Sequence, residues 1–308
     1  MKREINLGVS VIMLTYNREK YVANMIECIL AQDYKAFEFI IVDNGSTDSS
    51  GKVAEEYAGR DERIRVIHRE RGNIGSGRNA GLDVAQGEYI AFVDDDDECT
   101  PDFLSFLYSL AEENGADVSI CGATWSEYDE KCVMSPQEAL ETLLWRKRYN
   151  VAFPTKLIRR ELFRNNRFPE TGKYDDIYLM PQILANAQRV AYHGVSKYCF
   201  VRHENNNSAW TQNHRLINKE TLNEYLEVYR RRTEWLCDIF PEKMIAWKYF
   251  EWSFMLSMTE KIIRLELDDC YDICKSMKRE LLEHKEEFVE SGLLLDFEKE
   301  WVKQYLPG

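Results

Sequence analysis

The chain has 308 residues, of which 44% are hydrophobic and 30% are charged, and its formal net charge at pH 7 is −13. This apolar content can build a substantial core and excludes a wholly disordered chain. The acidic balance repels phosphate backbones, which argues against a nucleic-acid-binding surface. We therefore expect no nucleic acid among the partners.

The sequence lacks the usual signals for export or membrane insertion. Its longest apolar stretches, such as Val9–Leu14 and Tyr89–Val93, are far shorter than the roughly 20 residues that span a bilayer. Met1–Glu4 is charged, but no apolar core of a signal peptide follows it. The eight cysteines are scattered without a C-x-x-C pair, which favours reduced core thiols. We expect a cytoplasmic protein with at most a peripheral contact at the inner face of the membrane.

Short apolar strands alternate with helical patterns over the first 120 residues. The expected strands are 9–14, 38–43, 64–68, 89–93 and 117–121. The expected helices are 18–32, 49–57, 77–85 and 101–113. Strands that are apolar on both faces and alternate with helices predict an α/β fold with a mostly parallel sheet covered by helices. Such sheets bind ligands at the carboxyl ends of their strands.

The pattern changes after residue 122. Short strands are expected at 124–128, 152–158, 190–192 and 197–201, around a helix at 175–187. Helical patterns at 222–239, 242–265 and 269–290 then predict a C-terminal helical extension. We place the domains at 1–213, with halves 1–122 and 123–213, and at 214–308.

The helix expected at 242–265 is apolar on nearly every face between Trp247 and Met258. A helix of this kind is buried by more than one neighbour. Packing on the first domain is one explanation, and docking to an acceptor-bearing partner or a membrane surface is another. We favour a homo-oligomer built partly by residues 214–308.

Four polar motifs follow the predicted strands: Thr15–Asn17, Asp43–Asp48, Asn73–Asn79 and Asp94–Asp97. A parallel sheet brings such loops to one edge. The four consecutive aspartates repel one another unless a cation or a network of donors offsets their charge. Helix capping by Asp97 or Thr100 explains only one or two of them. Because Mg²⁺ and Mn²⁺ prefer carboxylate oxygen, the run predicts a metal–nucleotide site.

Together, the segments Val9–Asn17, Phe39–Asp48, Asn73–Gly81 and Gly87–Asp97 resemble glycosyltransferase family 2. The resemblance is dense over residues 1–120 and continues thinly to about 210. It implies a GT-A fold and a metal-dependent, inverting hexosyltransferase. The implied donor is a nucleotide sugar, with UDP favoured. The implied acceptor is a lipid- or protein-linked glycan of a surface polysaccharide or glycoconjugate.

The resemblance also implies roles for single residues. Tyr16 would stack on the base, and Asp43 would accept the uracil imide N–H. Asp94 and Asp96 occupy the two carboxylates of the family's D-x-D motif, with Mn²⁺ or Mg²⁺ on Asp96 and near Asp94. The whole nucleotide site implied in this half is Thr15, Tyr16, Asn17, Asp43, Gly75, Arg78, Asp94 and Asp95.

Further along, Arg167–Glu170 and Tyr174–Tyr178 resemble the family segment that carries the catalytic base. Inverting transfer needs a carboxylate that takes the proton of the acceptor hydroxyl. Asp176 matches that base, and Asp175 stands where the family usually has Glu. Capping of the following helix is the alternative for this pair.

The segment from Tyr198 resembles the family's C-terminal strand and loop, in which basic and polar groups meet the diphosphate. It implies that Arg202 and Ser208 contact the diphosphate and that His203 contributes to the metal site.

Several alternatives stay open at this point. Asp43 and Asp48 could form Asx-turns, and Asn79 could cap a helix. The glycines of Gly72–Gly81 could indicate a dinucleotide fold, but they follow the third strand and lack the G-x-G-x-x-G spacing. A non-catalytic sugar-binding or scaffold protein could keep the same fold. A nucleotidylyltransferase would need a Gly-rich, basic loop after the first strand, where Thr15–Asn17 stands.

Overall fold

A computed structural model of the chain describes residues 7–123, 129–203, 211 and 213–307. The chain divides into two compact units, Met1–Val201 and Arg202–Gly308. The strand expected at 124–128 and the predicted contact Ser208 lie outside the described residues. All eight cysteines are free thiols.

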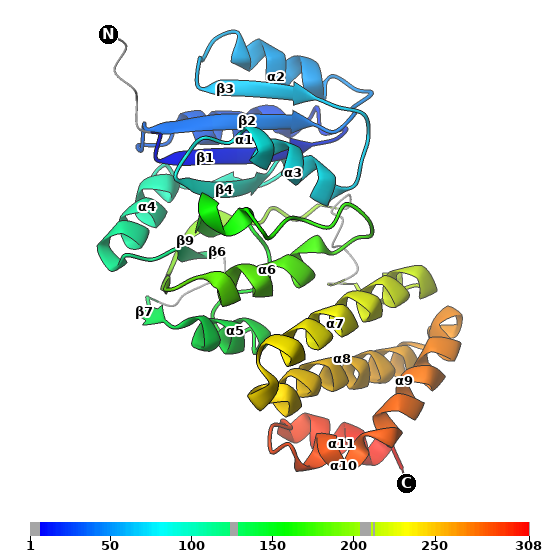
Figure 1. The fold of residues 1–308 in the computed structure, drawn as a ribbon. Helices are drawn as coiled ribbons and strands as arrows, with labels where there is room; N and C mark the ends of the chain where they lie inside the picture. The colour runs from blue at the N-terminus through cyan, green and yellow to red at the C-terminus, as the bar shows by residue number, and fades with distance from the viewer. Residues whose placement is uncertain (1–6, 124–128, 204–210, 212, 308) are drawn as a thin grey trace. The chain divides into compact units, whose positions relative to one another are not determined.

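The first unit begins with four parallel strands in the order β3-β2-β1-β4 (Figure 1). These strands are β1 (Val9–Thr15), β2 (Phe37–Asp43), β3 (Ile64–His68) and β4 (Tyr89–Asp94). The helices that alternate with them and follow β4 are α1 (Val22–Leu30), α2 (Ser50–Ala58), α3 (Ile74–Val84) and α4 (Phe103–Asn114). Because Thr15 pairs with Asp43 and Asp43 with His68, three strands bring polar residues to one sheet edge.

The rest of the sheet is mixed. Strand β8 (Lys156–Arg159) runs antiparallel to β4 and to β6 (Val118–Ala123), and β6 lies parallel to β9 (Val190–Cys199). The short strands β5 (Glu98–Cys99) and β7 (Lys131–Met134) pair antiparallel with β9. Within the described residues the sheet therefore has nine strands. The α/β prediction is confirmed, but the parallel order extends only over β1–β4 and the β6–β9 pair.

The elements after residue 123 depart most from the expected boundaries. The two short strands predicted at 190–192 and 197–201 are one long strand, β9. Helix α5 (Pro136–Leu144) was not expected from the pattern; it begins with a capping box between Ser135 and Glu138. Helix α6 (Asp175–Asn186) lies where a helix was predicted.

The core of the first unit lies between the sheet and its helices. Val11, Met13, Phe39 and Ile41 are completely buried, as expected for strands covered by helices on both faces. Helix α3 lies directly against β1, since a Cβ on Gly77 would lie 2.3 Å from a methyl of Leu14. This contact brings the amino-terminal half of α3 close to the ends of the strands.

The second unit is helical (Figure 1). Its helices are α7 (Lys219–Ile239), α8 (Met244–Leu265), α9 (Tyr271–Glu283), α10 (Lys285–Glu290) and α11 (Asp296–Tyr305). Helix α8 contacts all the other four, which confirms that its apolar faces are buried by several neighbours. The single helix expected at 269–290 is two helices that meet at His284. No helix among the described residues is long and apolar enough to cross a membrane.

Candidate active site

The loops that follow β1 and β2 are tied to each other by hydrogen bonds. The Asn17 side chain accepts from the Thr47 N–H at 2.8 Å, and the Asn17 N–H donates to the Ser46 hydroxyl at 3.1 Å. Asp48 accepts from the Ser50 N–H at 2.9 Å, as in an Asx-turn. Asn17, a predicted nucleotide contact, therefore also shapes the loop, with a left-handed φ of 52°.

Asp43 ends β2 and is almost completely buried. Its Oδ1 accepts from the Ser46 N–H at 2.9 Å, and its Oδ2 lies 3.0 Å from Nδ1 of His68. The other ring nitrogen of His68 lies 2.9 Å from a carboxylate oxygen of Glu55. The hydrogen bonds to Asp43 and then to Glu55 raise the pKa of His68. Since each carboxylate oxygen has two lone pairs, Asp43 can accept a further donor.

The side chains of Tyr16 and Thr15 have different surroundings. The Arg71 guanidinium lies over the Tyr16 ring, with its carbon 4.5 Å from the ring centroid. A base that stacks on this face of Tyr16 must therefore displace Arg71. Thr15 is completely buried, and its hydroxyl has no hydrogen-bond partner of normal geometry among the described residues. Burial raises the pKa of Asp95, and the nearby Thr15 hydroxyl opposes only part of that rise. Thr15 therefore meets the predicted metal loop inside the protein.

The aspartate run after β4 is compensated within the protein. Arg18 Nε lies 3.8 Å from Asp95 and 3.7 Å from Asp96. Burial raises the pKa of Asp95 to about 7. Burial, and then the charge of Asp94, raise the pKa of Asp97 to about 8. Asp97 also accepts from the N–H of Val201 at 2.8 Å. Neither Asp97 nor Thr100 caps α4, which begins at Phe103 after Asp102.

Arg78 joins two of the predicted motifs. Its guanidinium lies 3.2 Å from Asp175 Oδ2 and 3.5 Å from Asp94 Oδ1. Burial lowers the pKa of Arg78, but the charges of Asp175 and Asp94 outweigh it, and the pKa is raised. The rings that surround this guanidinium, with centroids 5.3–5.8 Å away, are Phe92, Phe153 and Phe168. The structure therefore brings Arg78, Asp94 and Asp175 into one cluster.

Asp176 follows Asp175 in the first turn of α6, where the helix dipole favours negative charge. Its Oδ1 accepts from the N–H of Ile177 at 2.9 Å. Burial, and then the charge of Asp175, raise the pKa of Asp176 to about 6. Asp175 pairs with Arg78 and does not cap the helix. At neutral pH, Asp176 is a carboxylate able to take a proton.

Helix α3 holds the segment that precedes α6. A Cβ on Gly75 would lie 2.2 Å from the Pro169 carbonyl oxygen, so only glycine fits there without a shift. Asn79 donates to the Phe168 carbonyl at 2.9 Å and accepts from the Phe168 N–H at 3.1 Å. Asn79 lies inside α3, so the alternative of a helix cap is wrong. Gly75, a predicted nucleotide contact, therefore packs against the 168–170 segment.

Two residues of this region were missed by the sequence reasoning, His68 and Lys156. Lys156 is fully buried in β8, and its ammonium donates to the Ala152 carbonyl. Burial lowers its pKa to about 7, against the opposing influence of Cys121 and Asp176. The available signal was a lysine inside an apolar strand. The available signal for His68 was a histidine at the end of a predicted strand, which the register of β2 and β3 places beside Asp43.

Two carboxylates of the aspartate run could hold a divalent cation that takes its other ligands from the substrate and water. In the described part of the chain, no group of three or more His, Cys, Asp or Glu side chains could hold a metal ion. Asp94 and Asp96 remain as two carboxylates, which is typical of Mg²⁺ that takes its other ligands from substrate phosphates and water. The predicted diphosphate contact Arg202 and the predicted metal ligand His203 are the first two residues of the second unit.

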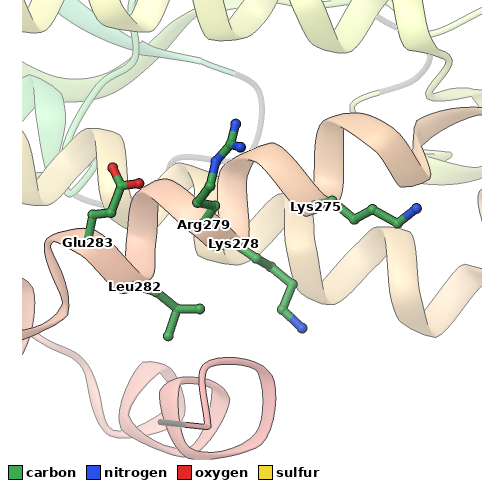
Figure 2. A pocket seen from close by; sticks show the side chains of 5 residues that line it. All are labelled: Lys275, Lys278, Arg279, Leu282 and Glu283. Atoms are coloured by element: carbon green, nitrogen blue, oxygen red, sulfur yellow. The ribbon is translucent and has the colours of Figure 1, made fainter.

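A groove of about 520 Å³ in the second unit is a weaker candidate for a site (Figure 2). All its lining residues lie on α9: Lys275, Lys278, Arg279, Leu282 and Glu283. Active sites usually combine an enclosed cavity with polar groups that converge from several elements. One face of one helix does not provide this.

Comparisons with known proteins agree with the geometry. The family "Glycosyl transferase family 2" matches residues 10–170. The chain is 33% identical over 214 residues to the glycosyltransferase GlyG of Streptococcus pneumoniae, covering 63% of this chain and 70% of GlyG. It is 31% identical over 194 residues to the poly(ribitol-phosphate) beta-N-acetylglucosaminyltransferase TarS of Staphylococcus aureus, covering 59% of this chain and 33% of TarS.

Solved structures show the same fold. TarS 1–349 in complex with UDP has a TM-score of 0.60 at 25% identity, over 75% of this chain and 65% of that chain. The complex of TarS 1–349 with UDP-GlcNAc has a TM-score of 0.66 at 21% identity, over 92% of this chain and 79% of that chain.

Proposed function

The chain belongs to glycosyltransferase family 2 and is a glycosyltransferase of GT-A fold, and on that premise we propose a metal-dependent, inverting hexosyltransferase that uses a UDP-sugar. Transfer of a sugar from a nucleotide donor is the activity of this class. We propose a glycan of a surface polysaccharide or glycoconjugate as the acceptor. Peripheral membrane contact and cytoplasmic location stay predictions from the sequence.

One observation carries the proposal. Arg78 contacts Asp94 in the predicted D-x-D motif and Asp175 beside the predicted base. Asp94 ends β4 and Asp175 begins α6, 81 positions later in the sequence, yet both lie within 3.5 Å of one guanidinium. Burial raises the pKa of Asp94, and a carboxyl with a raised pKa beside a second carboxylate and a buried cation is an arrangement typical of catalytic centres. This supports a single site in which the donor diphosphate and the acceptor meet.

The residues divide the chemistry between them. Asp176 takes the proton of the acceptor hydroxyl as the oxygen forms its bond to the sugar. Asp43 accepts the uracil imide N–H, and Tyr16 stacks on the base once Arg71 moves. When bound by Asp94 and Asp96, a divalent cation would offset the negative charge of the departing diphosphate.

A thermal-shift experiment tests the donor and the metal. UDP with Mn²⁺ is expected to raise the melting temperature, because a ligand that binds only the native state stabilises it. At about 100 times the dissociation constant this amounts to about 2.7 kcal/mol. UDP in EDTA is expected to give a much smaller shift, and GDP serves as the control nucleotide.

Two variants make the test specific. Asp96→Asn is expected to lose the difference between Mn²⁺ and EDTA. Asp296→Asn, which alters an almost fully exposed carboxylate in the second unit, is expected to keep it. Equal shifts with and without metal in the unmodified chain contradict the metal assignment. The absence of any shift with UDP contradicts the donor.

A further inference from the structure

His68 connects two acidic side chains at the edge of the sheet. It ends β3 directly beside Asp43, which ends β2. Its Nδ1 lies 3.0 Å from Asp43 Oδ2, and its Nε2 lies 2.9 Å from Glu55 Oε1 on α2. The site residues inferred from family resemblance include Asp43 but neither His68 nor Glu55.

The protonation state of His68 follows from these two contacts. A neutral imidazole has one N–H donor and one acceptor nitrogen, whereas an ionised carboxylate only accepts. Both contacts can therefore be hydrogen bonds only when the ring is an imidazolium. In agreement, the hydrogen bonds to Asp43 and then to Glu55 raise the pKa of His68.

Among the described residues, the charged groups that act most strongly on the ring are Asp43 on β2 and Glu55 on α2. Helix α2 packs tightly here, since a Cβ on Gly51 would lie 2.5 Å from Asp43 Oδ2 and 3.1 Å from the His68 ring. The ring is nevertheless half exposed, at 51%, so it exchanges protons with solvent.

We propose that His68, as an imidazolium, is a positioning residue that fixes the Asp43 carboxylate for recognition of the uracil base. The inference rests on the proposed UDP-sugar function. One oxygen of Asp43 is held by the Ser46 N–H and the other by His68, so the plane of the carboxylate is fixed at two points. A carboxylate held in this way presents its remaining lone pairs in one direction.

The sign of the pH dependence follows from the raised pKa of His68. Below its pKa, both hydrogen bonds are made and Asp43 is fixed. As the pH rises through this pKa, the ring keeps a single N–H for two carboxylates, and in the tautomer that donates to Glu55 the bare Nδ1 faces Asp43 and no longer holds it. The affinity for UDP is therefore expected to fall as the pH increases. The loss of one hydrogen bond corresponds to about three- to tenfold in affinity.

The test is calorimetric titration of UDP with Mg²⁺ between about pH 6 and pH 8, where histidine changes its charge. UDP also titrates in this range, since the second phosphate pKa lies near 6. So do Asp95 and Asp97, because burial raises their pKa values to about 7 and about 8. These contributions are the same in the unmodified chain and in His68→Gln, so the difference between the two profiles reports on His68 alone. The glutamine amide keeps an N–H donor but does not titrate. The unmodified chain is expected to lose about three- to tenfold more affinity than His68→Gln over this range.

Two further variants sharpen the result. Glu55→Gln replaces the competing carboxylate with an amide that can donate to Nε2, so the neutral ring keeps its N–H on Asp43 and the fall in affinity is expected to be smaller. His193→Gln removes a different histidine–carboxylate pair, with Asp129, and is expected to keep the original profile. If UDP binds and the profiles of the unmodified chain and His68→Gln are parallel, the His68 proposal is overturned alone. If UDP binds at no pH, the proposed function itself fails.

Discussion

The negative charge of the Asp94–Asp97 run is compensated at the level of single side chains. Arg18 lies beside Asp95 and Asp96, and Arg78 lies beside Asp94. The raised pKa values of Asp95 and Asp97, about 7 and about 8, leave both partly protonated near neutral pH. Four adjacent acids are therefore tolerated without four full charges.

The base assignment predicts the behaviour of Asp176→Asn. Asparagine cannot accept the proton of the acceptor hydroxyl, so the transfer rate is expected to fall about 10²–10⁴-fold. UDP binding is expected to stay nearly unchanged, because Asp176 is not among the residues assigned to the nucleotide. Transfer and UDP titration are measured on the same protein. If the variant keeps more than about a tenth of the original turnover, another carboxylate is the base, with Asp175 next.

The pH profile of the unmodified enzyme gives a second readout of the same prediction. The base acts as a carboxylate, and the pKa of Asp176 is raised to about 6. As the pH falls below this value, the fraction of ionised Asp176 decreases about tenfold per unit. The rate of transfer is therefore expected to fall on the acid side of about pH 6, and an acid limb near pH 4 would contradict the assignment.

The side chains of the site differ in how well the sequence could predict them. Asp94, Arg78 and Asp175 fall in motifs whose order and spacing are specific, and the structure brings them together. His68 and Lys156 are single polar residues in strands without a motif. Their neighbours are fixed by the register of β2–β3 and by the antiparallel position of β8. No local pattern encodes either contact.

At the scale of elements, α3 connects the nucleotide half of the first unit with the base. It packs on β1 through Gly77, and it binds the 168–170 segment through Gly75 and Asn79. The β-α alternation up to residue 120 was predictable because strands and helices there have distinct periods. Strands β5 and β7, with two and four residues, are too short to show a period.

The contact of α3 with the 168–170 segment predicts that Gly75→Ala is destabilising. Alanine is a better helix former than glycine by about 1 kcal/mol, so an open position would gain stability. Here the new Cβ would lie 2.2 Å from the Pro169 carbonyl oxygen, and overpacking typically costs about 1–3 kcal/mol. We expect urea unfolding at lower concentration and slower transfer, since Asp175 and Asp176 follow this segment.

Gly59→Ala is the matched control. Gly59 follows α2, and its added Cβ would make only ordinary contacts of 3.6 Å. This variant is expected to be neutral or slightly stabilised, with unchanged transfer. Equal stability of the two variants would show that the 168–170 segment yields to the methyl group.

At the scale of the whole molecule, the two units differ in the apolar surface they expose. Among the described residues, the exposed large hydrophobic side chains of the first unit are Ile74 and Val133, whereas the second unit has ten. Ile239 and Phe297 are the most exposed of these, at 52% each. Contiguous apolar patches mark surfaces that bind other proteins. Because the second unit exposes more large apolar side chains, we expect the predicted homo-oligomer to form through it.

This distribution predicts a homo-oligomer that single charges in the second unit disrupt. Light scattering of the full chain at micromolar concentration is expected to give a mass of at least two chains. Ile239→Asp and Phe297→Asp each place a charge on exposed apolar surface, and at least one is expected to give the monomer mass, because burying an unpaired charge is costly. Val133→Asp alters a similarly exposed residue of the first unit, at 47%, and is expected to leave the mass unchanged. A monomeric full chain contradicts the prediction, and monomerisation by Val133→Asp alone would place the interface on the first unit.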